Sequence, residues 1–299
     1  MGAAWHACDA GRVLVARGRH HAWSGVGSLS IKSFRGGRAR YAAGPGTFAV
    51  DERSYLVLNQ GQEYSIALES ETPVESLCVF FEAALAADVL RGRLQNAGQL
   101  LDAPDAHAAG SPRFFERTYP NDDDVTPGIE RLRREVGESG PLWLEERLHE
   151  LLRALLRVHG GAEREARALP AARASTRDEL YRRLHRAREF LAASFAERVG
   201  LREAARAACL SPNHLLRTFP ALFGCTPHAW LTRRRIEAAR ELLARGEHDV
   251  TETCLAVGFE SPASFTRLFQ RHVGVSPAAF RTAAREKGDR GQARRQCSA

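Results

Sequence analysis

Residues 211–230 read SPNHLLRTFPALFGCTPHAW, and residues 261–280 read SPASFTRLFQRHVGVSPAAF. The two segments form a repeat with a period of 50 residues, because many residues of the first recur unchanged in the second. The recurring residues are Ser211, Pro212, Arg217, Phe219, Gly224, Pro227 and Ala229, which return as Ser261, Pro262, Arg267, Phe269, Gly274, Pro277 and Ala279. A match of this extent indicates that one structural unit is present twice.

The residue types of each repeat predict a helix, a tight turn and a second, capped helix. A short helix is expected at 201–209, and its counterpart at 250–257. Ser211 suits an N-cap, because its hydroxyl can accept a hydrogen bond from a free backbone N–H, and Pro212 suits the first helical position. Gly224 suits the left-handed conformation that ends a helix. This plan is that of the helix-turn-helix motif, whose second helix enters the major groove of DNA.

The outward face of each second helix supplies the predicted DNA contacts. Arg217 and Arg267 occupy equivalent positions and are the candidate base readers, since arginine pairs with guanine through two hydrogen bonds. Arg234, between the repeats, is the candidate phosphate contact. The predicted DNA-contacting residues are Ser211, Asn213, His214, Leu216, Arg217, Arg234, Ser261, Pro262, Ala263, Ser264, Thr266 and Arg267. The alternative for each arginine is an ordinary solvated side chain.

Two residues of the repeat depart from an ideal pair of reading helices. Pro220 lies inside the first recognition helix, and we expect it to kink or break that helix beyond Arg217. Pro262 and Ala263 offer no hydrogen-bonding side chains at the start of the second. A helix is also expected from Pro227 to about residue 244, connecting the two units, and another at 178–194 that adds to their shared core.

Charge is unevenly distributed along the 299 residues. The net charge is +7, but residues 176–299 carry +9 and residues 1–175 carry −2. A basic surplus confined to one region points to a polyanion as the partner of that region. Of the basic residues only Lys32 and Lys287 are lysines, so arginine identity alone is weak evidence of recognition and position must carry the argument.

The first half of the chain has a different pattern. Short strands separated by turn residues are expected at 20–82, followed by a helix at 82–94. Two helices, near 126–138 and 142–158, form a predicted hairpin whose second member carries an apolar stripe. The stripe residues are Leu144, Leu148, Leu151, Leu152, Leu155 and Leu156. Packing against the strands and a dimer interface both explain such a stripe.

The run AVGFESPASFTRLFQRHVGVSPAAFR at 256–281 is similar to the AraC/XylS family of bacterial transcription regulators, and the resemblance covers residues 180–285. The segment YAAGPGTFAVDERSYLVLNQGQEYSIALESETPVESLCVFF, at 41–81, resembles the cupin-like sensor domain of many such regulators. The resemblance implies an α+β protein with a small N-terminal β-barrel and helical hairpin, followed by an all-α domain of seven helices with two helix-turn-helix motifs. The domains then expected are a cupin-like effector domain at 1–120, a helical hairpin at 121–160, a linker at 161–175, a DNA-binding domain at 176–285 that folds alone, and a disordered tail at 286–299.

Other classes of function find little support. Residues 36–82 contain no histidine, so a metal site in the barrel is not expected, and neither a catalytic triad nor a phosphate-binding loop is present. The six cysteines are too far apart to suggest a metal or disulfide framework, and no apolar run is long enough to span a membrane. We therefore expect a cytoplasmic regulator that is not an enzyme and has no cofactor. The alternatives are a non-specific DNA-organising protein and a cupin-type enzyme fused to a DNA-binding domain.

The expected partners follow from this interpretation. They are double-stranded promoter DNA, a small-molecule effector at the N-terminal domain, RNA polymerase if the protein activates transcription, and a second copy of the chain if the hairpin at 126–158 dimerises. No membrane partner is expected.

Overall fold

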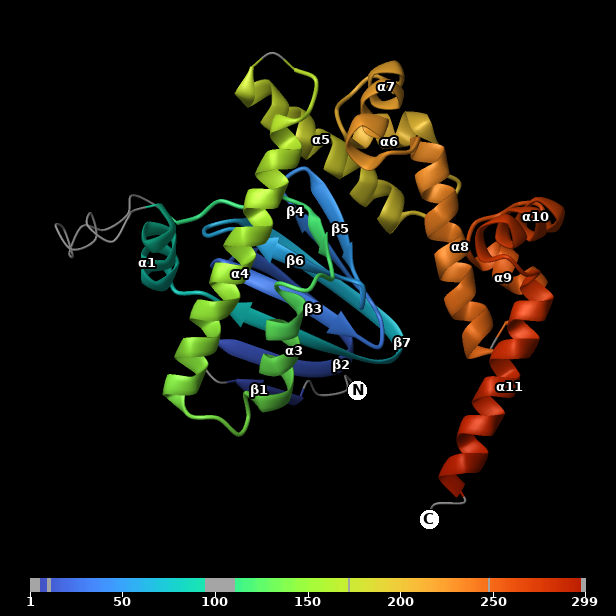
Figure 1. The fold of residues 1–299 in the computed structure, drawn as a ribbon, viewed down its shortest axis with the longest axis horizontal. Coiled ribbons are helices and arrows are strands. Elements are labelled where there is room, and N and C mark those ends of the chain that lie inside the picture. The colour runs from blue at the N-terminus through green and yellow to red at the C-terminus, as the bar shows by residue number, and fades with distance from the viewer. Residues whose placement is uncertain (1–5, 10–11, 95–110, 172, 247, 297–299) are drawn as a thin grey trace. The chain divides into compact units, whose positions relative to one another are not determined.

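The computed structural model describes residues 6–9, 12–94, 111–171, 173–246 and 248–296. Its internal contacts divide the chain into two compact units, Met1–Ala193 and Ser194–Ala299. Figure 1 shows an antiparallel, barrel-like sheet with flanking helices in the first unit and helices in the second. The predicted α+β organisation is confirmed. Within the part of the chain that is described, no helix combines the length and the apolar character that crossing a membrane requires.

The sheet of the first unit is entirely antiparallel, with the strand order β1-β2-β7-β3-β6-β8, while β4 pairs with both β5 and β7. Its strands are β1 (His6–Asp9), β2 (Val13–Val26), β3 (Ser30–Arg35), β4 (Ala39–Ala43), β5 (Gly46–Val50), β6 (Ser54–Leu58), β7 (Glu63–Phe80) and β8 (Thr118–Pro120). The expectation of uniformly short strands was wrong for β2 and β7, which run for 14 and 18 residues. They are long because β7 pairs with β2 along most of its length and also with β3 and β4.

Each face of the sheet buries its own apolar cluster. Helices α1 (Ala83–Leu94), α3 (Thr126–Glu135) and α4 (Pro141–Arg167) cover one face (Figure 1), where Ile31 and Val79 belong to the same buried cluster as Leu148 and Leu152. The leucine stripe is thus covered by the chain's own sheet. Packing against the strands accounts for the stripe, which no longer argues for a dimer.

Helix α4 is longer than the hairpin helix expected at 142–158. It continues to Arg167, so the linker predicted at 161–175 is in large part helical. Gly160 lies inside it and leaves room for the guanidinium of Arg93, which donates a hydrogen bond to the backbone oxygen of Leu156. Buried Ala162 and Ala166 supply the packing that holds this last part of the helix.

Helix α5 (Ala174–Ala193) corrects the predicted boundary at residue 176. The chain's contacts place α5 in the first unit, where it packs against β5 and α4, and the second unit begins at Ser194. Leu180 and Leu184 are buried as expected, but so are Tyr181, His185 and Glu189 on another side of the helix. A fragment 176–285 would expose these side chains, so the prediction that it folds alone loses its support.

The second unit contains the repeat. Its helices are α6 (Leu201–Ala207), α7 (Pro212–Phe223), α8 (Pro227–Arg245), α9 (Val250–Ala256), α10 (Pro262–Val273) and α11 (Pro277–Gln296). Helix α11 runs through most of the segment 286–299 that was predicted to be a disordered tail. The segment EKGDRGQARRQ at 286–296 is rich in strong helix formers, which explains why its two glycines do not end the helix.

Candidate nucleic-acid interface

The turns of the two helix-turn-helix motifs both require a left-handed residue. Cys209 follows α6 with φ of 52°, and Gly258 follows α9 with φ of 84°. A Cβ at Gly258 would lie 2.8 Å from the backbone oxygen of Ala196, so glycine is needed there for space as well as for conformation. The turns bring α6 against α7 and α9 against α10.

The two recognition helices, α7 and α10, start and end as the sequence predicts. The Ser211 hydroxyl accepts a hydrogen bond from the backbone N–H of His214 at 3.2 Å, and that of Ser261 accepts one from Ser264 at 3.4 Å. Each helix begins with proline after this cap, and each ends at a glycine in the left-handed conformation. These local contacts fix where each polar outer face begins.

Aromatic packing fixes the rotation of each recognition helix. Phe265 and Phe269 of α10 are buried, with ring centroids 5.6 Å apart, and Phe269 also contacts the ring of Phe280 on α11. In α7, Leu215 and Phe219 are buried at the equivalent positions. With these side chains directed into the core, the opposite side of each helix faces solvent.

The structure places most of the predicted DNA-contacting residues on these solvent faces. Arg217 and Arg267 are both exposed, at equivalent positions in the second turns of α7 and α10. The other exposed members are Ser211, Asn213, Leu216, Ser261, Pro262 and Ala263, and the half-buried ones are His214, Ser264 and Thr266. Both recognition helices therefore present most of their predicted DNA-contacting residues to solvent.

The sequence did not lead us to predict contacts on the C-terminal half of the exposed face of α10. Gln270 and Arg271 are exposed there, and with Arg267 they border an open hollow of about 640 Å³. They follow Arg267 by three and four residues, so the helical period alone was enough to find them. Their equivalents in α7 are Pro220 and Ala221, which have no hydrogen-bonding side chains. The α10 face is consequently richer in donors than that of α7.

Pro220 does not break α7. The helix continues past it to Phe223, and the backbone N–H of Gly224 donates to the Pro220 oxygen at 2.9 Å. The expectation of a break at this residue was wrong. The carbonyl that proline leaves without an N–H donor belongs to Leu216, a residue that is 45% exposed, where water can supply the missing hydrogen bond.

The arginine run on α8 divides into packed and exposed members. The Arg234 guanidinium is half-buried, 5.2 Å from the Phe195 ring centroid. Arg235 donates to the backbone oxygens of Phe195 and Glu197 at 2.7 and 2.8 Å, and burial lowers its pKa. Arg233 is exposed. The predicted phosphate contact, Arg234, is thus engaged within the unit, and its neighbour Arg233 is the accessible cation.

The interior face of the barrel-like sheet holds a buried cation. Lys32 of β3 is 2% exposed, and its Nζ lies 4.1 Å from the ring centroid of Phe80 and 5.6 Å from that of Tyr64. Burial lowers its pKa, and among the described residues the group that counteracts this effect is the Cys78 thiol rather than a carboxylate. Lys32 and buried Phe34 are two residues apart in β3, so both side chains project from the same face of the strand.

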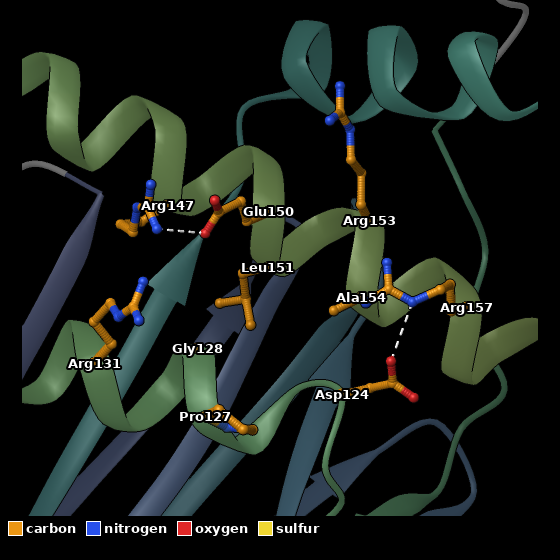
Figure 2. Close-up of a pocket in the computed structure, with 10 residues that line it drawn as sticks. All are labelled: Asp124, Pro127, Gly128, Arg131, Arg147, Glu150, Leu151, Arg153, Ala154 and Arg157. Carbon is orange, nitrogen blue, oxygen red and sulfur yellow. Dashed lines mark hydrogen bonds and ion pairs between the residues drawn. The ribbon is translucent and has the colours of Figure 1, made fainter.

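The outer side of the first unit carries a second group of cations. A hollow of about 340 Å³ lies between α3 and α4. Figure 2 shows four of the side chains that line it, Arg131, Arg147, Arg153 and Arg157. Two of these cations are already paired within the hollow, Arg147 with Glu150 at 2.6 Å and Arg157 with Asp124 at 3.1 Å. Within the described residues, no three His, Cys, Asp or Glu side chains are grouped so that they could hold a metal ion.

Comparison with known proteins accounts for both units. Residues 6–152 match the model of the AraC-like ligand binding domain, and residues 204–283 match that of a helix-turn-helix domain. The probable transcription factor PqrA of Proteus vulgaris is 37% identical over 68 residues, which are 23% of this chain and 56% of that protein. The arabinose operon regulatory protein of Escherichia coli is 32% identical over 83 residues, or 28% of each chain.

Solved structures give a likeness of limited extent. The DNA-binding domain of the global transcriptional factor AdpA, solved with a target DNA, is 31% identical, covers 35% of this chain and 94% of its own, and superposes with a TM-score of 0.34. The chain spans less than two thirds of the length of PqrA and of the arabinose regulator. With one family model on each unit and a capped repeat inside the second, the chain belongs to the AraC/XylS family of transcription regulators.

Proposed function

We propose that the protein is a sequence-specific DNA-binding transcription regulator, with double-stranded promoter DNA as its partner. The observation that carries this proposal is the presence, in one unit, of two capped recognition helices whose exposed faces both carry arginine at the equivalent position, Arg217 and Arg267. Helix α8 connects them with 19 residues, which span ~28 Å at the rise of an α-helix. A connector of that length suits two helices placed in successive major grooves, about 34 Å apart.

The proposal assigns different tasks to the arginines. Arg217 and Arg267 read guanine, and Gln270 and Arg271 extend the reading face of α10 alone. Exposed Arg233 contacts phosphate, in place of Arg234, whose guanidinium lies on Phe195. The second motif therefore supplies more of the sequence preference than the first.

A non-specific DNA-organising protein is the alternative. It would bind promoter and random DNA alike, because its contacts are to phosphate. Selection of bound fragments from the source genome, followed by binding isotherms on a selected fragment and on random DNA of equal length, separates the two functions. A regulator gives affinities that differ by at least about a thousandfold, and an organiser gives equal affinities. A cupin-type enzyme has no observation in its favour, and we propose no catalytic role or cofactor.

We further propose that the first unit binds a small anionic effector on the interior face of its sheet. Lys32 is buried among aromatic rings and, among the residues that the structure describes, has no carboxylate partner, which is costly; an anionic ligand there would offset the cost. The arginine hollow of Figure 2 is a weaker candidate, because two of its cations are already paired.

The scarcity of lysine makes this effector site testable. Protein labelled with ¹³C at lysine Cε gives two lysine signals, from Lys32 and Lys287, and Lys32→Met identifies the first. Sodium octanoate should move the Lys32 signal and leave that of Lys287 in place, whereas uncharged 1-octanol should move neither. If octanoate at millimolar concentration leaves the Lys32 signal unchanged, the effector is not anchored there by its charge.

The remaining partners are inferred from this function. RNA polymerase is the further partner if the bound regulator activates transcription, and a homodimer would double the number of recognition helices on one promoter. We place the protein in the cytoplasm, where promoter DNA is accessible to a bacterial regulator. Sedimentation of the full chain at micromolar concentration tests the dimer.

A further inference from the structure

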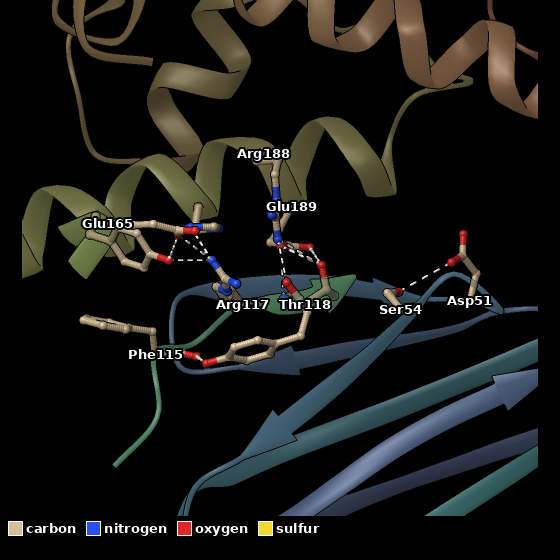
Figure 3. Close-up of polar contacts among 11 residues, drawn as sticks. Asp51, Ser54, Phe115, Arg117, Thr118, Glu165, Arg188 and Glu189 are labelled. Carbon is tan, nitrogen blue, oxygen red and sulfur yellow. Dashed lines mark hydrogen bonds and ion pairs between the residues drawn. The ribbon is translucent and has the colours of Figure 1, made fainter. Parts of the chain in front are cut away.

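Helix α5 is tied to strand β8 by a buried carboxylate. Glu189 of α5 is 1% exposed and accepts hydrogen bonds from the backbone N–H of Thr118 at 3.1 Å and from its hydroxyl at 2.8 and 2.9 Å. Arg188, the preceding residue of α5, donates to the Thr118 carbonyl oxygen at 2.8 Å and pairs with Glu189. Figure 3 shows Thr118 held by both side chains.

A second group of polar contacts lies beside the first. Arg117, which is 8% exposed, donates to the Tyr181 hydroxyl, to the Glu165 carboxylate at 3.2 Å and to His185 Nε2 at 3.2 Å. The Tyr181 hydroxyl in turn donates to Glu165 of α4 at 2.7 Å. Two successive residues, Arg117 and Thr118, thus make the hydrogen bonds that hold α5 against this edge of the sheet.

Strand register connects Thr118 to the interior of the barrel. Leu56 of β6 pairs with Thr118 of β8 on one side and with Lys32 of β3 on the other, and Lys32 pairs with Cys78 of β7. Register-paired residues lie on one face of a sheet, and neighbouring strands are ~4.8 Å apart, so Lys32 and Thr118 lie ~10 Å apart in one row. The row Cys78, Lys32, Leu56 and Thr118 leads from the buried cation to the residue that holds α5.

The chemistry of this docking favours reversibility. Buried charged groups stabilise a packed state only weakly in net terms, because desolvation offsets most of their attraction, but they require one particular geometry. An apolar contact between α5 and β8 would tolerate small movements of Thr118. A carboxylate that accepts from both the backbone N–H and the hydroxyl of one residue does not.

We propose that α5 is a latch that transmits the state of the barrel interior to the DNA-binding unit. The proposal rests on the proposed function. A ligand that moves Lys32 also moves the other residues of the row. Displacement of Thr118 weakens its hydrogen bonds with Glu189 and Arg188, and α5 then detaches from β8. Because the chain passes from Ala193 of α5 directly to Ser194 of the second unit, release of α5 changes the freedom of the recognition helices and hence the affinity for DNA.

Two conservative variants of the full chain test the latch. Thr118→Val keeps shape and strand propensity but removes the hydroxyl that donates to Glu189, and Glu189→Gln keeps shape but removes the charge. Glu179→Gln is the matched control, because Glu179 is on the same helix but pairs with Arg182, Arg183 and Arg186 of α5 itself. Hydrogen exchange followed by mass spectrometry reports the amides of 174–193, and fluorescence anisotropy reports affinity for a selected DNA fragment.

Both latch variants should raise exchange in α5 by at least about tenfold while β2 and β7 keep their protection, and should change DNA affinity by at least about fivefold. Glu179→Gln should do neither. Unchanged exchange in α5 overturns the latch, and so does faster exchange with unchanged DNA affinity, which makes the contact merely structural. If Glu189→Gln does not fold, Thr118→Val alone decides between these results. A wild-type chain that binds selected and random DNA equally contradicts the proposed function instead.

Discussion

Thr118 of β8 and Glu189 of α5 are 71 residues apart in the chain, yet the hydroxyl of one donates to the carboxylate of the other at 2.8 Å. Glu189 is almost completely buried at this contact, whereas the side chain of Glu179, ten residues earlier on the same helix, is 44% exposed. The same residue type on one helix therefore has two very different environments, one between helix and strand and one on the helix surface.

Truncation of these two glutamates should have unequal effects on stability. Glu189→Ala leaves Arg188 and Thr118 with unmet hydrogen bonds in a buried place, so we expect a loss of about 3–5 kcal/mol in the free energy of unfolding. Glu179→Ala removes only surface pairs and should cost less than about 1 kcal/mol. Urea denaturation of the full chain measures both, and equal losses would contradict the structure of this contact.

His185 should make stability depend on pH. Its pKa lies well below the ordinary value of 6.5, because burial and the charges of Arg188 and Arg117 disfavour the protonated ring. Arg117, which precedes β8, and Tyr181 and Arg188 of α5 lie near its ring. Glu165 of α4 and Glu189 of α5 pair with these two arginines. The unfolded chain takes up a proton below pH 6.5 and the folded chain does not. Stability conferred by neutral His185 is therefore present above pH 6.5 and is lost as the pH falls below it.

A His185→Phe variant checks this sign. It should flatten the fall in urea midpoint between pH 6.5 and pH 5, with a residual slope from His159, whose pKa burial also lowers. A variant that retains the full wild-type slope would show that other groups cause the pH dependence.

Glycine substitutions should separate the turn of the second motif from the end of its recognition helix. Gly258 and Gly274 both have positive φ, but a Cβ at Gly258 meets the backbone of Ala196 and Phe195, while one at Gly274 meets nothing within 4 Å. Gly274→Ala should cost about 1–2 kcal/mol from conformation alone. Gly258→Ala should cost clearly more, because a backbone clash is added. Thermal unfolding compares the two, and a smaller loss for Gly258→Ala would be inconsistent with this turn.

The arginine run of α8 should respond according to exposure rather than residue type. If Arg233 contacts phosphate, Arg233→Ala weakens binding to all DNA sequences alike and lowers the slope of log affinity against log salt by about one. Arg234→Ala should leave that slope unchanged and lower stability, since its guanidinium packs on Phe195. Titrations at several salt concentrations decide this, and a changed slope for Arg234→Ala alone would reverse the assignment.

The parts of the fold that the sequence predicted depend on contacts between near neighbours. The cap of Ser211 on His214 spans three residues, and the same is true of Ser261 and Ser264, so residue types alone were sufficient. The recurrence of both caps after 50 residues then identified the motif. The proline at 220 misled because its effect depends on whether water can reach the carbonyl of Leu216, and that exposure is a property of the folded unit.

The parts that the sequence did not predict depend on contacts between distant residues. The helical spacing of Leu180 and Leu184 in α5 predicts that both are buried, but it does not show what covers them. Likewise, no residue near Glu189 in the sequence points to Thr118 as its partner. Lys32 was visible as one of two lysines, but its burial follows from the pairing of β3 with both β6 and β7. Gln270 and Arg271, on the C-terminal half of the exposed face of α10, could have been predicted from the helical period, because they follow Arg267 by three and four residues.

We expect Arg217 and Arg267 to read bases from two recognition helices of one unit. This base reading is measured by binding isotherms of the wild type, Arg217→Ala and Arg267→Ala over a library of single-base variants of a selected fragment. We expect each substitution to cost about 1–3 kcal/mol on the selected fragment and to relax preference at one base position, with the larger effect for Arg267, whose helix also carries Gln270 and Arg271. If both variants keep the wild-type preference at every position, neither arginine reads a base and the claim is contradicted.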